Sequence, residues 1–332
     1  MTQILASSLR RVLFAAATFT VATTHAGVII TPVYDTSFTL RPNFAALQTT
    51  VNNAIAIYAS NMGDNLTLAI NFKFDPLIAG AQSEYASVNF SYTDYRNALV
   101  VKATTANDAT VLANLSAGPN DPVIGGANVA VPQALGLALG LSGVQGNYGT
   151  VSFNTATYSS NPAGFLGVIQ HEVNEVLGTG SNLPNNVNGV LPGPGGGPAV
   201  LPTTIAPSDL FRYATNGTRS FTLNLANDPA AKAFFRLSPG GPNQQEFNNL
   251  PNGGDYGDWY TGAGRLFAAA PQDQNGDENT FTSMSNSPAE LILLDAIGYN
   301  AFPVPEPGTV MSLSVVAFGW LTMRRRERAV RR

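Results

Sequence analysis

Three ionisable residues on one short stretch could bind a metal ion. His171, Glu172 and Glu175 lie within the segment 164–177, whose remaining residues include Phe165, Leu166, Val168, Ile169, Val173, Val176 and Leu177. The apolar residues recur at helical spacing, so the segment is predicted to be a helix that ends at Gly178. On a helix, His171 and Glu175 share one face about one turn apart and can hold the same divalent ion.

The position of Glu172 and the lack of nearby cations support this chemistry. Glu172 stands between the two candidate ligands, as the general base does in an HExxH zinc helix, where it takes a proton from a water that attacks a carbonyl. Carboxylates on a largely buried helix need a partner, and no Lys or Arg lies between Lys102 and Arg212. A cation is the simplest partner.

The composition restricts the remaining ligands. The chain has 332 residues, no cysteine and two histidines, and His25 lies where a signal peptide would be cleaved. Disulfides, thiolate sites and sites with several imidazoles are therefore excluded, and the third ligand must be an oxygen. Asp209, Asp255 and Asp258 are candidates, whereas the hydroxyl of Ser181 is a poor zinc ligand.

The charge distribution argues against nucleic acid as a partner. The net charge is −4, but segment 27–304 keeps only nine basic residues against nineteen acidic ones, a formal charge of about −10. An acidic body of this kind is typical of an extracellular protein or a cation binder.

The rest of the first half predicts the elements that must position this helix. The spacing of apolar residues predicts a helix over 44–62, and alternation predicts a strand over 66–74. Residues 91–115 are predicted to form two helices. Residues 132–141 are predicted to form a short helix, and residues 148–154 a strand. The class is α+β.

The second half begins with a change in composition. Residues 178–207 contain thirteen Gly or Pro, so the chain is divided into an N-terminal part over 27–180, a loop over 181–207 and a C-terminal part over 208–302. Strands over 210–213 and 220–225 flank Asn216-Gly217, a hairpin dipeptide, and a further strand covers 233–237. Ser287 as N-cap, Pro288 and Glu290 mark the last helix.

Both ends indicate export. Residues 1–26 combine Arg10 and Arg11, an apolar stretch and a small-residue cleavage site, as a secretory signal does. Residues 303–332 contain Pro305-Glu-Pro307, an apolar run over 309–323 and six arginines, and this arrangement resembles the PEP-CTERM sorting signal. The resemblance implies Sec export, transient anchoring in the membrane by the C-terminal segment, processing by an exosortase and release or display at the cell surface.

Four stretches resemble a family of secreted bacterial metalloprotease-like proteins that often carry PEP-CTERM tails. They are residues 171–178, 207–213, 253–259 and 294–299, and the resemblance extends to 92–99. This family is distantly similar to zincins of the leishmanolysin or metzincin type. The resemblance implies a zincin-like fold with a mixed sheet, an active-site helix and a smaller C-terminal part. Leishmanolysin-type relatives have their third histidine ligand just before a tryptophan, where this chain has Asp258 before Trp259. Asp258 is therefore the favoured third ligand, with Asp209 as runner-up, and Met284 stands where such proteins have a methionine turn.

Two functions are consistent with these features. The first is a secreted zinc metallopeptidase that acts on protein or peptide substrates, with His171, Glu175 and Asp258 as ligands and Glu172 as general base. One imidazole with two carboxylates is a hard donor set that also suits Mn²⁺ or Ca²⁺. The second is a non-catalytic cell-surface or matrix protein on the same scaffold.

Overall fold

The computed structural model describes residues 27–78, 80–143, 146, 148–154, 162–183, 203–219, 232–248, 255–259 and 288–301. Several predicted features lie outside these residues: the secretory signal over 1–26, the sorting signal over 303–332, the strand over 220–225, Ser287 and Met284. Within the described part of the chain, no helix combines the length and apolar character that a membrane span requires.

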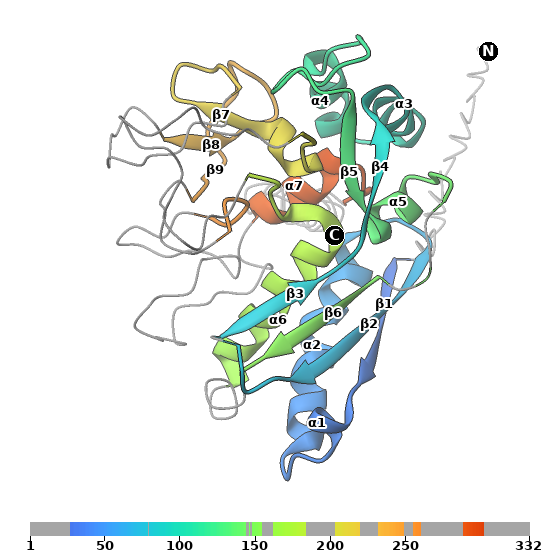
Figure 1. Ribbon diagram of the computed structural model, residues 1–332, viewed down its shortest axis with the longest axis vertical. Helices are drawn as coiled ribbons and strands as arrows, with labels where there is room; N and C mark the ends of the chain where they lie inside the picture. The colour runs from blue at the N-terminus through green and yellow to red at the C-terminus, as the bar shows by residue number, and fades with distance from the viewer. Residues whose placement is uncertain are drawn as a thin grey trace, which may run out of the picture.

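A mixed four-stranded sheet forms the lower half of the molecule (Figure 1). Its strands are β1 (Val28–Tyr34), β2 (Leu66–Phe74), β6 (Gly149–Phe153) and β3 (Ala81–Glu84), in the order β1-β2-β6-β3. The first three run parallel, and β3 pairs antiparallel with β6 at the edge of the sheet. The mixed sheet and the α+β class agree with the prediction.

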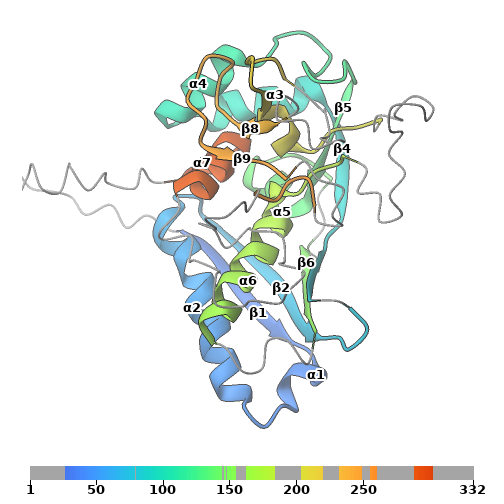
Figure 2. The same cartoon turned by 90° about the vertical axis from the view of Figure 1, so that its left-hand side faces the viewer.

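Two long helices pack side by side on one face of this sheet (Figure 2). They are α2 (Phe44–Asn61) and α6 (Pro162–Asn174), with the short α1 (Thr36–Thr39) at the far end of the sheet. The buried residues of α2 are Leu47, Val51, Ala54, Ile55 and Tyr58, and their spacing of three and four places them on the face toward the core.

Aromatic side chains fill the space between the sheet and the helices. Phe153 on β6 lies at the centre, and its ring centroid is 4.8 Å from that of Phe165 on α6 and 6.0 Å from that of Phe74 on β2. Phe38 stacks on Phe74 at 4.8 Å. This packing fixes the start of the helix that carries His171.

The other half of the molecule holds shorter elements (Figure 1). The strands β4 (Ser87–Ser91) and β5 (Asn128–Pro132) pair with each other beside the helices α3 (Tyr92–Lys102), α4 (Ala106–Asn114) and α5 (Gln133–Ala138). A 3₁₀ helix (Pro207–Phe211) leads into a sheet formed by β7 (Arg212–Ala214), β8 (Ala233–Phe235) and β9 (Gln245–Glu246). The last helix is α7 (Pro288–Ile297), which packs against α4.

Most predicted elements are confirmed, with ends that match or shift by at most three residues, but two predictions are wrong in part. The helix over 164–177 does not stay α-helical, because Glu175–Thr179 forms a π-helical turn in which Gly178 has a φ of 120°. The first half of the strand predicted over 210–213 is the end of the 3₁₀ helix, and extended structure starts only at Arg212. The Asn216-Gly217 turn is confirmed, since Gly217 has a φ of 83° and Ala214 N donates to Thr218 O at 2.8 Å.

Replacing Phe153 by Ala should destabilise the fold by about 3–5 kcal/mol, because the side chain is fully buried among four other phenylalanines. The free energy of unfolding from urea titrations measures this change. Leu77→Ala is the matched control, since Leu77 is 91% exposed and its removal should change stability little. Equal stability of the two variants would contradict this view of the core.

Candidate metal centre

The helix α6 is held in place by buried hydrogen bonds to α2. The Tyr58 hydroxyl lies 3.1 Å from the main-chain oxygen of Gln170 and 2.8 Å from Asn174 Oδ1, and Gln170 Nε2 donates to Ala54 O at 3.1 Å. These contacts lie on either side of His171 in sequence. They fix the rotation of the helix, so His171 and Glu175 face away from α2.

The loop Asp255–Trp259 approaches the end of this helix very closely. A Cβ atom on Gly257 would lie 2.6 Å from Thr179 O and 2.9 Å from Ser181 N, so only glycine fits there. Asp255 Oδ1 accepts hydrogen bonds from Gly257 N at 2.6 Å and Ser181 N at 3.3 Å. The carboxylate of Asp255 therefore joins the loop to the chain that leaves the helix.

Two buried side chains hold the loop from the other side. The guanidinium of Arg212 donates to Tyr256 O at 2.7 Å and to Asn248 O at 2.9 Å. The ring of Trp259 lies 4.9 Å from that of Phe247, and both residues are almost fully buried. Asp258, between Tyr256 and Trp259, is thereby fixed beside the helix.

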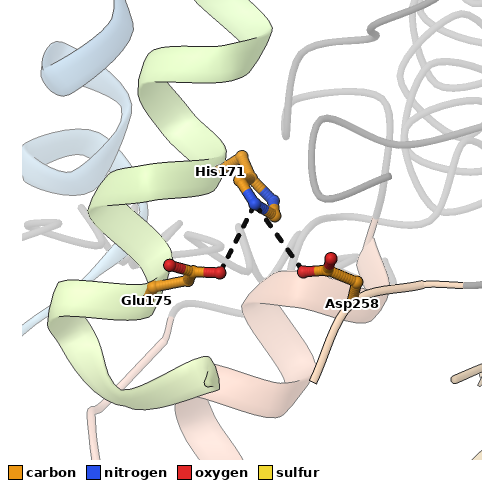
Figure 3. A group of neighbouring side chains, drawn as sticks. All are labelled: His171, Glu175 and Asp258. Atoms are coloured by element: carbon orange, nitrogen blue, oxygen red, sulfur yellow. Dashed lines mark ion pairs between the residues drawn. The ribbon is translucent and has the colours of Figure 1, made fainter. Parts of the chain in front are cut away.

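Two carboxylates, one from the end of the helix and one from the loop, converge on one atom, Nε2 of His171 (Figure 3). Glu175 Oε1 lies 3.5 Å from this nitrogen and Asp258 Oδ1 lies 3.6 Å from it. One ligand atom from each of the three residues lies within 4.8 Å of the others. The cavity beside them is lined by His171, Asn174, Glu175, Thr179, Gly257, Asp258, Trp259 and Glu290.

Burial dominates the electrostatics of this group. It lowers the pKa of His171 from 6.5 to about 4, so the imidazole is neutral and its nitrogen is free to bind an ion. Burial, opposed by a hydrogen bond from Ser83, raises the pKa of Glu175 to about 7. Burial and the charge of Glu175 raise the pKa of Asp255 to about 7. Burial and neighbouring carboxylates raise the pKa values of Glu172 and Asp258 well above their usual range.

The donor set fits a divalent cation. A neutral imidazole and carboxylate oxygens are the ligands that zinc accepts, and the same set suits harder ions. Oε2 of Glu172 and Nδ1 of His171 are buried and have no hydrogen-bond partner among the described residues. Several carboxylates that repel one another in a low-dielectric site would each be ionised more easily beside a positive ion.

Two of the predicted site residues, Glu172 and Asp209, lie outside the group of His171, Glu175 and Asp258. Glu172 Oε1 lies 3.8 Å from His171 Nε2, but Glu172 belongs neither to the converging trio nor to the described lining of the cavity. Asp209, the alternative third ligand, accepts hydrogen bonds from Ser181 Oγ at 2.6 Å, Ala206 N at 2.8 Å and Asn182 N at 3.1 Å. Its carboxylate secures the chain after the helix, whereas Asp258 lies at the histidine.

Sequence reasoning missed three residues that contact the trio or its cavity. Ser83 on the edge strand β3 donates a hydrogen bond to Glu175 Oε2. Asn174 and Glu290, both nearly fully buried, line the cavity. From the sequence, Glu290 is interpreted only as a helix-capping residue, and nothing in the local sequence distinguishes Ser83 from other strand serines.

No protein-family model matches the chain, and no curated protein or solved structure shows significant similarity to it.

The stability of the metal-free protein should fall as the pH rises from 6.5 to 8. In this range His171 is neutral in the folded state, and the unfolded His171 loses its remaining proton, which has a smaller and opposite effect on stability. The larger effect comes from the raised pKa values of Glu175 and Asp255, because the folded state keeps protons that the unfolded state has already lost. The net loss should be on the order of 1 kcal/mol. Urea titrations after chelation measure it, and added Zn²⁺ should stabilise the protein more at pH 8 than at pH 6.5. A flat profile with no effect of zinc would contradict the electrostatic account.

Gly257→Ala should weaken Zn²⁺ binding at least tenfold and destabilise the fold by about 1–3 kcal/mol, because the new Cβ would collide with the main chain at Thr179. Competition with a chromophoric chelator measures the affinity. Gly146→Ala is the control, since a Cβ there meets no atom within 4 Å. Unchanged binding in the Gly257 variant would show that the loop does not need this close approach.

Proposed function

We propose that this protein is an exported metal-dependent peptidase. The observation that carries the proposal is the convergence of Glu175 Oε1 and Asp258 Oδ1 on Nε2 of a neutral histidine, with a further glutamate next to that histidine. The i, i+4 spacing of His171 and Glu175 with Glu172 between them is the arrangement expected of a zincin-type helix. The finer assignment of a zincin-like fold is part of this proposal.

The residues have separate roles in this scheme. His171, Glu175 and Asp258 would hold the ion, which when bound supplies Lewis acidity toward a water and a peptide carbonyl. Glu172 accepts a proton from the attacking water and passes it to the leaving amine. Burial raises its pKa, so in the ionised form it is a stronger base than an exposed glutamate. The 3.8 Å distance from its Oε1 to His171 Nε2 supports this role.

We propose zinc as the ion, with Mn²⁺ or Ca²⁺ as alternatives. One nitrogen and two carboxylate oxygens form a three-ligand set of the kind that leaves a coordination position for water or substrate. Two anionic ligands reduce the Lewis acidity of zinc relative to a site built from histidines. The expected consequence is modest catalytic power.

We propose export and sorting on the basis of sequence features near the two ends of the chain. The predicted secretory signal over 1–26 supports Sec-dependent export, and the Pro-Glu-Pro segment with its apolar run and arginines supports anchoring and processing by an exosortase. The proposed substrates are therefore proteins or peptides outside the cell or at its surface.

The second candidate is a non-catalytic surface or matrix protein with a structural metal site. The observation that favours it is the donor set itself, because two carboxylates and a single imidazole make a weaker Lewis acid than the usual zinc site. The two candidates share the metal but differ in whether Glu172 matters for peptide hydrolysis.

Glu172→Gln should lower the rate of casein cleavage by about 10²–10⁴-fold while zinc content stays at one ion per chain, because the amide cannot accept the proton. Metal content by mass spectrometry and cleavage of a fluorescent casein substrate are the two measurements. Glu84→Gln, at an exposed glutamate on β3, is the matched control and should keep full activity. His171→Ala should lose both metal and activity.

The outcomes separate the candidates. Absence of stoichiometric metal from the wild-type protein would exclude the peptidase, and stoichiometric metal without cleavage that depends on Glu172 would favour the structural site.

A further inference from the structure

Each of the two converging carboxylates directs one oxygen at His171 and has the other oxygen occupied. Glu175 Oε1 lies 3.5 Å from His171 Nε2, while its Oε2 accepts a hydrogen bond from the hydroxyl of Ser83. Asp258 Oδ1 lies 3.6 Å from the same nitrogen, while its Oδ2 accepts one from the main-chain N–H of Asp255 at 3.1 Å. The pattern is the same on both sides of the histidine.

We propose that Ser83 is a positioning residue that makes Glu175 a one-oxygen ligand and thereby favours zinc over ions that need more oxygen ligands. This inference rests on the proposed metal site. With Oε2 engaged by Ser83, only Oε1 is presented toward His171, and the main-chain donor at Asp255 restricts Asp258 in the same way. The three residues then supply three ligand atoms in total.

The number of ligand atoms decides which ion is preferred. Zinc in proteins takes four ligands, so three protein atoms satisfy it with one position left open. Manganese and calcium take six or more, mostly oxygens, and gain from carboxylates that bind through both oxygens. A hydrogen bond that withholds one oxygen from the ion therefore disfavours the larger coordination shells. Outer partners of this kind typically change metal affinity by about 10- to 100-fold.

The location of Ser83 supports a positioning role. It lies on the edge strand β3, whose pairing with β6 sets Ser83 opposite Val151 and fixes the backbone relative to the sheet. Glu175 begins the π-helical turn at the end of α6. The hydrogen bond thus joins the sheet edge to the metal-binding face of the helix, and π-helical turns often occur at functional sites.

A pair of variants with the same shape tests the proposal on the full-length protein. Ser83→Thr keeps the hydroxyl, Ser83→Val removes it, and both β-branched residues suit a strand. Affinities for Zn²⁺ by chelator competition and for Mn²⁺ by electron paramagnetic resonance are measured for both and for wild type. Ser87→Ala, an exposed serine at the start of β4, is the control. Thermal melts confirm that each variant is folded.

The expected result is wild-type affinity in the Thr variant and in the control, with Zn²⁺ affinity about 10- to 100-fold lower in the Val variant while Mn²⁺ affinity does not fall. Equal affinities of the Thr and Val variants for both ions would overturn the role of Ser83. An equal loss for both ions would overturn its role in selectivity. Failure of the wild type to bind either ion would instead overturn the metal site itself, so the two failures are distinguishable.

Discussion

The structure of the site depends on the cost of placing several carboxylates around one imidazole in a buried environment. Glu172, Glu175, Asp255 and Asp258 all have raised pKa values, and burial is the largest cause in each. A group of like charges with this little solvent is stable only if protons or a cation neutralise it. Glu172 and Glu175 lie on α6 and the turn that follows it, and Asp255 and Asp258 lie on the loop that packs against this turn.

Two glycines make that arrangement possible. Gly178 has a φ of 120° in the turn that begins at Glu175, and Gly257 lets the loop lie in contact with Thr179. The buried guanidinium of Arg212 then holds the loop through main-chain oxygens, and burial lowers its pKa to about 10. The guanidinium donates its hydrogen bonds to main-chain carbonyl groups next to the site. It therefore stabilises the loop and does not pair with His171, Glu175 or Asp258.

Features that depend on local periodicity and spacing could be predicted from the sequence. The i, i+4 relation of His171 and Glu175 follows from any helix, and the α2 helix and the β2 strand follow from apolar periodicity. Asp258 is favoured only by the family resemblance, through its place before Trp259, whereas spacing alone leaves Asp209 and Asp255 open as well. In the structure Trp259 packs against Phe247. The strands β1, β3, β4 and β5 were missed because β1 and β5 lack clean alternation and β3 and β4 are short and largely polar. Ser83 could not be found, because its partner Glu175 is 92 residues away and only the tertiary fold joins them.

The same electrostatics explain how the fold can form before an ion is bound. A carboxyl with a pKa of about 7, such as Glu175 or Asp255, takes up a proton near neutral pH at little cost, so protons can neutralise the cluster where an ion is absent. His171 does not take part, because burial keeps it neutral and its Nε2 stays available. An ion that binds must then displace protons from carboxylates but not from the histidine. In the proposed metal site the imidazole would be a ligand that needs no deprotonation, and the carboxylates would make ion binding depend on pH.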